Sequence, residues 1–170
     1  WDVDELIVLD IGDGEMTFEH HRADYHHKPV TTLLEFINGI AVECRIPLTL
    51  GGRIRSLDDI HARILNGADK VALNTALADD PDLITRAARS FGSQAIVASI
   101  DYRVIDGATR VFTDRGTRDT GTDAAAWARR AADAGAGEVL LNAIDRDGAA
   151  RGYDLDTIDE VAKAVEIPVI

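Results

Sequence analysis

Two kinds of apolar pattern alternate along this chain. Five short runs rich in β-branched residues have the length of a strand and little polar alternation; they span 5–11, 46–50, 69–74, 94–101 and 138–144. Strands that are apolar on both sides are typical of parallel sheets covered on both faces. Between these runs, helical patterns span about 30–44, 56–67, 80–92, 121–135 and 154–165. This alternation predicts successive βα units of an α/β protein.

An internal repeat favours one class of α/β fold. The segment 5–14 resembles 138–148, an offset of 133 residues, and 42–50 resembles 164–170, where Pro47 and Pro168 are 121 residues apart. Such a repeat suits a (βα)8 barrel built by duplication better than a doubly wound sheet. Subtracting 121 from 133 leaves twelve extra residues in the connection after the first strand. We therefore predict one partial (βα)8-barrel domain over 1–170, with an inserted βα loop at about 12–29.

The number of predicted strands is too small for a closed barrel. A complete barrel typically needs about 250 residues, and these 170 residues provide about five and a half βα units, which we assign to barrel strands 2 to 7. The repeat places a missing strand before residue 1. We expect either that the chain is part of a longer protein or that a partner, such as a second copy, completes the barrel, because open parallel edges would stay unpaired.

Composition narrows the classes of function. The net charge of −12, with no clustered basic face, argues against nucleic acid as a partner. No apolar stretch is long enough to span a membrane, and the first twenty residues show neither a basic start nor a small-residue cleavage site. We therefore expect no membrane association and a cytoplasmic location. The single cysteine, Cys44, has no internal disulfide partner and is expected to be a structural thiol.

Four of the five histidines lie in the segment 20–29, HHRADYHHKP. Their spacing does not place ligands on one helical face and no cysteine is close, so we expect no metal site here. The segment makes up most of the predicted insertion. Its histidines are therefore candidates for substrate contact or for a lid, and equally for a solvated loop.

Polar residues stand where the predicted strands end, which is the face of a barrel where functional groups gather. Asp101 follows an apolar strand, and partial burial there would raise its pKa and suit general acid–base chemistry; the alternative is a carboxylate that caps a loop. LGGRI at 50–54 and NTA at 74–76 offer backbone amides and a hydroxyl that would suit one phosphate, or turns without a ligand. DRDG at 145–148 lacks the spacing of a calcium loop.

Five segments together resemble the cyclase subunit of imidazole glycerol phosphate synthase. They are IPLTLGGRI, GADKVALNTA, LITRAARSFGSQAIVASID, DGATRVFTDRGTRDTG and GAGEVLLNAIDRDGAARGYD. The resemblance covers 2–170 apart from the insertion and implies a lyase of histidine biosynthesis without a cofactor. In this family a glutaminase subunit releases ammonia, which crosses the barrel and attacks a phosphorylated ribulosyl formimino substrate. The products are imidazole glycerol phosphate and an aminoimidazole carboxamide ribotide.

The resemblance also implies roles for single residues. Asp101 matches the family's acid–base aspartate, and Asn74 and Thr75 match one phosphate site with Gly51 and Gly52 nearby. Arg53 replaces a family glycine and would either bind phosphate bidentately or fill the pocket. Asp147 and Gly148 match the loop that contacts substrate, and Asn142 is a further candidate for substrate binding. Glu5, Lys70 and Glu138 match the ring at the ammonia entrance, and Asp69 matches the glutaminase surface. A purely structural ion-pair ring is the alternative for the three charged residues.

Departures from the family pattern leave other functions open. The family's second catalytic aspartate belongs to the first barrel strand, which this chain lacks, so we expect no turnover by these residues alone. Asn142 and Ala143 replace hydroxyl residues, and some segments resemble a branch of the family that forms amidines on surface sugars. A half-barrel module that binds phosphate or a partner chain without catalysis is the second class of function.

Overall fold

The computed structural model describes residues 3–12 and 32–170, and the predicted insertion lies outside these residues except for its first position, Gly12. The described part contains seven strands, six α-helices and one short 3-10 helix. The strands are β1 (Leu6–Leu9), β2 (Leu48–Gly51), β3 (Lys70–Leu73), β4 (Ile96–Ile105), β5 (Ala108–Thr113), β6 (Arg118–Asp119) and β7 (Glu138–Ala143). The α-helices are α1 (Leu33–Glu43), α2 (Leu57–Leu65), α3 (Thr75–Asp79), α4 (Asp82–Phe91), α5 (Ala124–Ala134) and α6 (Leu155–Ala164), and η1 spans Ser93–Ala95.

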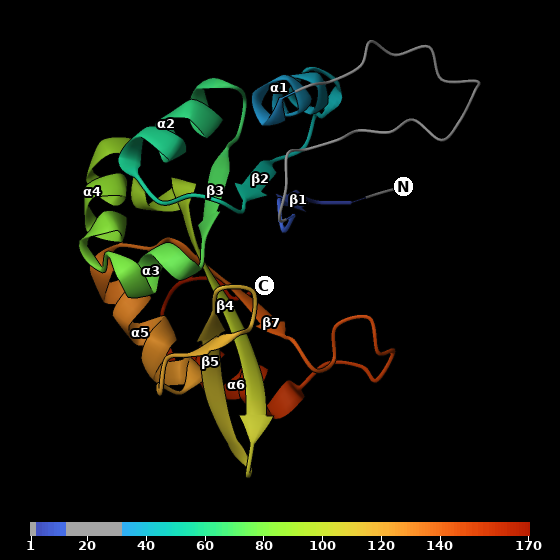
Figure 1. The fold of residues 1–170 in the computed structure, drawn as a ribbon, viewed down its shortest axis with the longest axis vertical. Helices are drawn as coiled ribbons and strands as arrows, with labels where there is room; N and C mark the ends of the chain where they lie inside the picture. The colour runs from blue at the N-terminus through green and yellow to red at the C-terminus, as the bar shows by residue number, and fades with distance from the viewer. Residues whose placement is uncertain (1–2, 13–31) are drawn as a thin grey trace.

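The parallel strands form one curled sheet in the order β1, β2, β3, β4, β7. An isolated parallel bridge between Val139 and Val169 adds the start of a further strand beside β7. Helices α2, α4 and α5 lie along one side of this sheet (Figure 1). A curled parallel sheet with helices on its outer face confirms the predicted partial (βα)8 barrel.

The alternation of side chains along each strand separates two faces. Val71, Leu73, Ile96, Ala98 and Ile100 are buried and belong to the main core cluster, which also holds residues of α2, α4, α5 and α6. A smaller cluster joins Ile37 of α1 to Leu48 and Leu50 of β2. Thr49, Ala72, Val97 and Ser99 alternate with these core residues along their strands and therefore face the concave side.

Local sequence explains where the helices begin and end. Ser56 and Asp59 form a reciprocal capping box at the start of α2. The Asp123 carboxylate accepts a hydrogen bond from the Ala126 amide at the start of α5, and Gly135 ends that helix in the left-handed conformation. These caps fix the helix positions and, with them, the loops that follow each strand.

Two features differ from the pattern expected along the chain. β4 continues to Ile105 and turns through Asp106 and Gly107, both at positive φ, into the antiparallel β5 and β6, where we predicted no element. An Asp-Gly pair between two strands is a hairpin signal. The short helix α3 directly after β3 was also not predicted. Among the described residues, no helix is long and apolar enough to cross a membrane.

Candidate functional site at the carboxyl ends of the strands

Asp101 and Asn142 are direct neighbours in the ladder between β4 and β7. The Asn142 Nδ2 donates a hydrogen bond of 3.0 Å to the Asp101 Oδ1. Burial raises the pKa of the Asp101 carboxyl, the hydrogen bond from Asn142 opposes this, and the negative charge of Asp147 adds to it. Asp101 is therefore a partly buried carboxylate that holds a proton more readily than an ordinary aspartate.

Asn74 and Thr75 follow β3 on the neighbouring part of the rim. The Asn74 Nδ2 donates to the Ser99 carbonyl of β4 at 3.1 Å. The Thr75 hydroxyl accepts a 3.0 Å hydrogen bond from the Asp114 amide and lies 3.3 Å from the Asn74 Oδ1, to which it donates. These bonds fix one amide and one hydroxyl between the ends of β3 and β4.

Gly51 and Gly52 allow the end of β2 to approach the end of β1. The Asp10 amide donates to the Gly51 carbonyl at 2.9 Å. Gly52 has φ +91°, and a Cβ there would overlap the backbone of Asp10, so a side chain at this position would push the two loops apart. The glycine pair therefore allows the two loops to pack closely, whether or not a ligand binds there.

Arg53 stands at positive φ and turns its guanidinium to the end of β1. Its Nε lies 3.0 Å from the Asp10 Oδ2, and its Nη2 donates to the Gly12 carbonyl at 2.7 Å. The Asp10 carboxylate is nearly buried, whereas the Arg53 side chain is 42% exposed. Arg53 belongs to the predicted phosphate loop after β2, and its guanidinium contacts the loop after β1.

Arg63 is a residue of this region that the sequence did not suggest. It lies on α2 and is only 5% exposed. Its Nη2 donates to the Gly52 carbonyl at 2.8 Å and its Nη1 to the Asp59 carbonyl at 3.0 Å. Burial lowers the pKa of Arg63, while Asp59 and Asp10 oppose the shift. From the sequence of α2 alone, Arg63 is expected only to lie one turn after Asp59. The sequence near Arg63 does not indicate that a separate loop buries its side chain.

Asp147 and Gly148 lie in an exposed loop after β7. The Asp147 amide donates to the Ala143 carbonyl at 3.0 Å. The far end of this loop is fixed by Asp154, whose Oδ2 accepts from the Tyr102 hydroxyl at 3.1 Å and from the Thr157 hydroxyl at 2.8 Å. The loop therefore has a buried anchor at one end and open residues where substrate contact was predicted.

At the opposite end of the strands, Glu5, Lys70 and Glu138 form one ion-paired group. The Lys70 Nζ lies 2.8 Å from the Glu5 Oε2 and 2.6 Å from the Glu138 Oε2. Although burial acts against both shifts, hydrogen bonds from Lys70 and Thr49 lower the pKa of Glu5, and those to Glu138 and Glu5 raise the pKa of Lys70. The structure brings together the three charges that the resemblance places in one ring.

Asp69 lies next to this group and is exposed, but its carboxylate has a structural partner. The Leu48 amide donates to the Asp69 Oδ2 at 2.8 Å, and the Asp69 amide donates to the Leu48 carbonyl at 2.9 Å. Asp69 thus continues the pairing between β2 and β3 beyond the strand ends.

Neither a metal-binding cluster nor the cavity beside α6 marks this site in the described residues. Within residues 3–12 and 32–170, no group of three or more His, Cys, Asp or Glu side chains is arranged to hold a metal ion. The histidine-rich segment 20–29 lies outside the described residues. In the described part, a cavity of about 820 Å³ lies between the β4–β5 hairpin and α6; Tyr102 and Thr157 line it, and Asp101 does not. The polar groups described above lie at the strand ends instead.

Comparison with known proteins identifies the family. The histidine biosynthesis protein family model matches residues 19–170. Proteins named imidazole glycerol phosphate synthase subunit HisF are similar over 167 residues, with 44% identity in Metallosphaera sedula, 43% in Sulfurisphaera tokodaii and 42% in Chlorobaculum tepidum. Each alignment covers 98% of this chain and 62% of the relative. The chain therefore spans less than two thirds of these relatives' length, and it belongs to the histidine biosynthesis protein family as a HisF-like member.

Proposed function

We propose that this protein is the cyclase subunit of an imidazole glycerol phosphate synthase, a lyase of histidine biosynthesis. The named relatives support this branch of the family rather than amidine formation on surface sugars. The observation that carries the proposal is the position of Asp101, a partly buried carboxyl with a raised pKa at the end of β4. Residues 1–170 form one partial-barrel domain in this proposal, with the insertion at about 12–29 in the loop after β1.

Asp101 acts as an acid–base group in this reaction. When ammonia attacks the ribulosyl formimino substrate, the new nitrogen centre must lose a proton, and ring closure and cleavage must return one to the leaving fragment. A carboxyl whose pKa is raised toward neutrality can take part in both transfers. The resemblance assigns the complementary aspartate to the first barrel strand, N-terminal to β1.

The substrate carries two phosphates, and the rim offers polar groups on both sides of Asp101. One phosphate binds to Asn74 and Thr75. The loop that contains Gly51, Gly52 and Arg53 lies nearby. On the other side, Asn142 adjoins the acid–base group, and Asp147 and Gly148 contact the substrate beyond it. This arrangement suits a long bis-phosphorylated molecule that crosses the rim above β4.

Ammonia enters at the other end of the strands in this proposal. The ring of Glu5, Lys70 and Glu138 lies at the strand starts and can open only if at least one ion pair separates. A glutaminase subunit binds at this end, where Asp69 is exposed. The relatives are named as subunits of a synthase, which supports an assembly with a second component.

The proposal is tested with the full-length protein, ammonium and the ribulosyl formimino substrate. We expect imidazole glycerol phosphate as product, and we expect Asp101→Asn to lower kcat by roughly 10²–10⁴-fold, the usual contribution of a positioned acid–base group. Asp133→Asn, an exposed carboxylate on α5, is the charge-matched control and should keep full activity. Absence of product from the parent protein with ammonium would exclude the proposed reaction.

A second comparison tests the ammonia ring separately from the chemistry. If Lys70 gates ammonia entry, Lys70→Met should change glutamine-dependent turnover with the glutaminase more than turnover with added ammonium. An equal effect on both would show that the three charges have only a structural role.

A further inference from the structure

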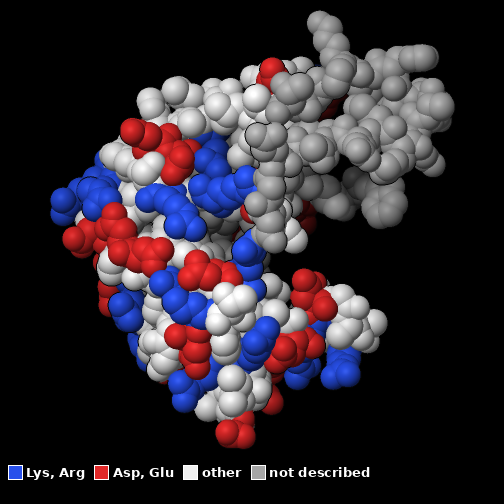
Figure 2. Space-filling model, in the orientation of Figure 1, with Lys and Arg blue, Asp and Glu red and all other residues white. Residues whose placement is uncertain are grey.

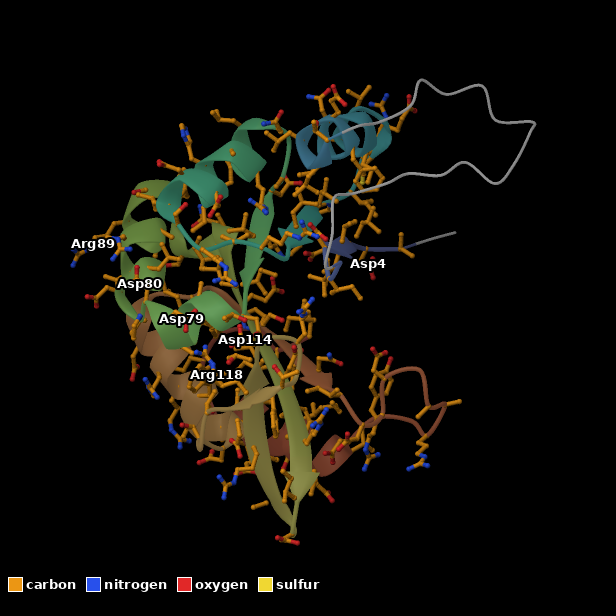
Figure 3. The ribbon with its side chains drawn as sticks, viewed as in Figure 1. Asp4, Asp79, Asp80, Arg89, Asp114 and Arg118 are labelled. Atoms are coloured by element: carbon orange, nitrogen blue, oxygen red, sulfur yellow. The ribbon has the colours of Figure 1, made fainter. Side chains whose placement is uncertain are left out.

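The tip of the β5–β6 hairpin, made of the turn and the start of β6, contacts both ends of α3. At the first residue of α3, the Asp114 amide donates to the Thr75 hydroxyl at 3.0 Å. At the last residue, the Arg118 Nη2 lies 2.7 Å from the Asp79 Oδ1. Figure 3 shows Asp79, Asp114 and Arg118 close together, from the helix, the turn and the hairpin strand. The turn and the helix thus form one connected unit.

Arg118 is the centre of this unit. Besides Asp79, its guanidinium contacts the Asp114 carboxylate, with Nε 3.0 Å from Oδ2, and donates from Nε to the Thr113 hydroxyl at 2.8 Å. Acidic and basic side chains interleave over the molecular face that contains this region (Figure 2). A guanidinium can hold several acceptors in a fixed plane, which an ammonium group cannot. Arg118 therefore fixes the orientation of the turn relative to α3.

The turn has a backbone that needs such support. Asp114, Arg115 and Gly116 have φ values of +49°, +59° and +75°, three successive residues in the left-handed region. Residues other than glycine adopt this conformation at a cost, and it persists where surrounding contacts hold it. The Thr117 hydroxyl donates to the Asp114 carbonyl at 2.6 Å and closes the turn from within. The contacts of Arg118 hold it from outside.

The consequence for Thr75 follows from the chemistry of a hydroxyl group. Its oxygen accepts from the Asp114 amide, so its single proton is left for one acceptor. That acceptor is now the Asn74 Oδ1 at a long 3.3 Å, and a phosphate oxygen would be a stronger one. The amide of Asp114 thus orients the hydroxyl, and Arg118 orients the amide.

We infer that Arg118 is a positioning residue for phosphate binding: through the turn 113–117, it holds the Asp114 amide on Thr75 and so presents the Thr75 hydroxyl to a substrate phosphate. This inference rests on the proposed phosphate site at Asn74 and Thr75. It assigns to the hairpin a role in substrate affinity, without contact between Arg118 and the reacting atoms.

The test measures phosphate affinity and turnover separately in the full-length protein. Inorganic phosphate is titrated while the backbone amide signals of Thr75 and Asp114 are followed by NMR. We expect Arg118→Ala to raise the Kd for phosphate and the KM for the substrate by about five- to tenfold, with kcat within about twofold. Arg118→Lys, which keeps the charge but not the planar fork, should give a smaller increase.

Two further variants separate positioning from general damage. Asp79→Asn removes the ion pair between Arg118 and α3 but leaves the bond between Asp114 and Thr75, and it should raise the phosphate Kd by about two- to threefold. Arg89→Ala removes an exposed arginine on α4, with no ion pair among the described residues, and should change neither constant (Figure 3). Faster hydrogen exchange of the Asp114 amide in Arg118→Ala would show that the turn has loosened.

Three results would overturn the inference. They are an unchanged phosphate Kd in Arg118→Ala, a loss of kcat without a change in affinity, and parent signals of Thr75 and Asp114 that do not respond to phosphate. The titration does not depend on turnover. If the parent protein forms no imidazole glycerol phosphate, the proposed reaction fails while the effect of Arg118 on phosphate binding is still measured.

Discussion

Asn142 donates a hydrogen bond of 3.0 Å to the Asp101 carboxylate from the directly opposite position in the β4–β7 ladder. This bond lowers the pKa of Asp101, whereas burial and the charge of Asp147 raise it, with burial the largest effect. The pKa of Asp101 is thus set by opposing effects, and those of Asn142 and Asp147 can each be removed by mutation.

The first prediction concerns the acid limb of the pH–activity profile. Asn142→Ala removes a donor to the charged form, so the pKa of Asp101 should rise and the acid limb should move to higher pH. Asp147→Asn removes a like charge, so the limb should move to lower pH, and added salt should reduce this smaller effect because Asp147 is exposed. Both are measured as kcat/KM against pH with ammonium as nitrogen donor; shifts in the same direction would contradict the assignment.

Much of this site is predictable from the sequence, because short segments around its residues indicate where the strands end. The apolar runs before Asp101 and Asn142 indicate strands, and parallel strands bring their ends to one rim. Glu5, Lys70 and Glu138 also stand at or just before strand starts, and their grouping in one ring is what the resemblance implies. The register between the strands then determines which of these side chains are neighbours.

Other parts depend on contacts between distant segments, and their residues carry no local signal. Arg63 is buried, and its guanidinium donates to the Gly52 carbonyl of another loop. The turn at Asp114 to Gly116 is held by α3, so its left-handed backbone follows from tertiary packing. Arg53 has several possible acceptors in the sequence, and only the approach of β1 to β2 selects Asp10.

The second prediction concerns Tyr102, which is 2% exposed and donates to Asp154. Burial and the nearby carboxylate raise the pKa of Tyr102 to about 12. The unfolded state would lose this proton near pH 10, so the folded protein should lose stability as the pH rises from about 10 to about 12. Tyr102→Phe should remove this alkaline loss and cost about 1–2 kcal/mol at neutral pH, because Asp154 loses a donor.

Urea unfolding at neutral pH and at pH values near 10 and 11 measures both effects. Tyr153→Phe is the control, since Tyr153 is 84% exposed and its hydroxyl group should contribute little. A parent and a Tyr102→Phe variant that lose stability equally in alkali would contradict the assignment.

The third prediction concerns Arg63 and the glycine turn. Arg63→Met keeps most of the side-chain length and avoids burial of a charge, but it leaves the Gly52 carbonyl without its donor and takes a positive charge away from Asp10. We expect the cost of the lost hydrogen bonds to exceed the gain from no longer burying a charge. The unfolding free energy should therefore decrease by about 1–2 kcal/mol. Thermal or urea unfolding checks this against Arg89→Met, which should be neutral. A stabilised Arg63→Met variant would show that burial of the charge dominates.

The last prediction concerns the ion-paired group at the strand starts. Lys70→Met leaves the partly buried carboxylates of Glu5 and Glu138 facing each other without a cation, so we expect a loss of about 1–3 kcal/mol in unfolding free energy at neutral pH. Lys163→Met breaks an exposed pair with Asp159 and should cost no more than about 0.5 kcal/mol.

The pH dependence of this loss has a sign that follows from the two shifted groups. The pKa of Glu5 is lowered, so its contribution is present above the ordinary glutamate pKa of about 4.3 and disappears as the pH falls through the folded-state value. The pKa of Lys70 is raised, so its contribution is complete below about 10.4 and disappears as the pH rises through the folded-state value. The difference between parent and Lys70→Met should therefore be largest between these limits and shrink on both sides, as urea unfolding across the pH range can measure. A difference that stays constant into acid would mean that lost packing of the lysine side chain, rather than its charge, causes the destabilisation.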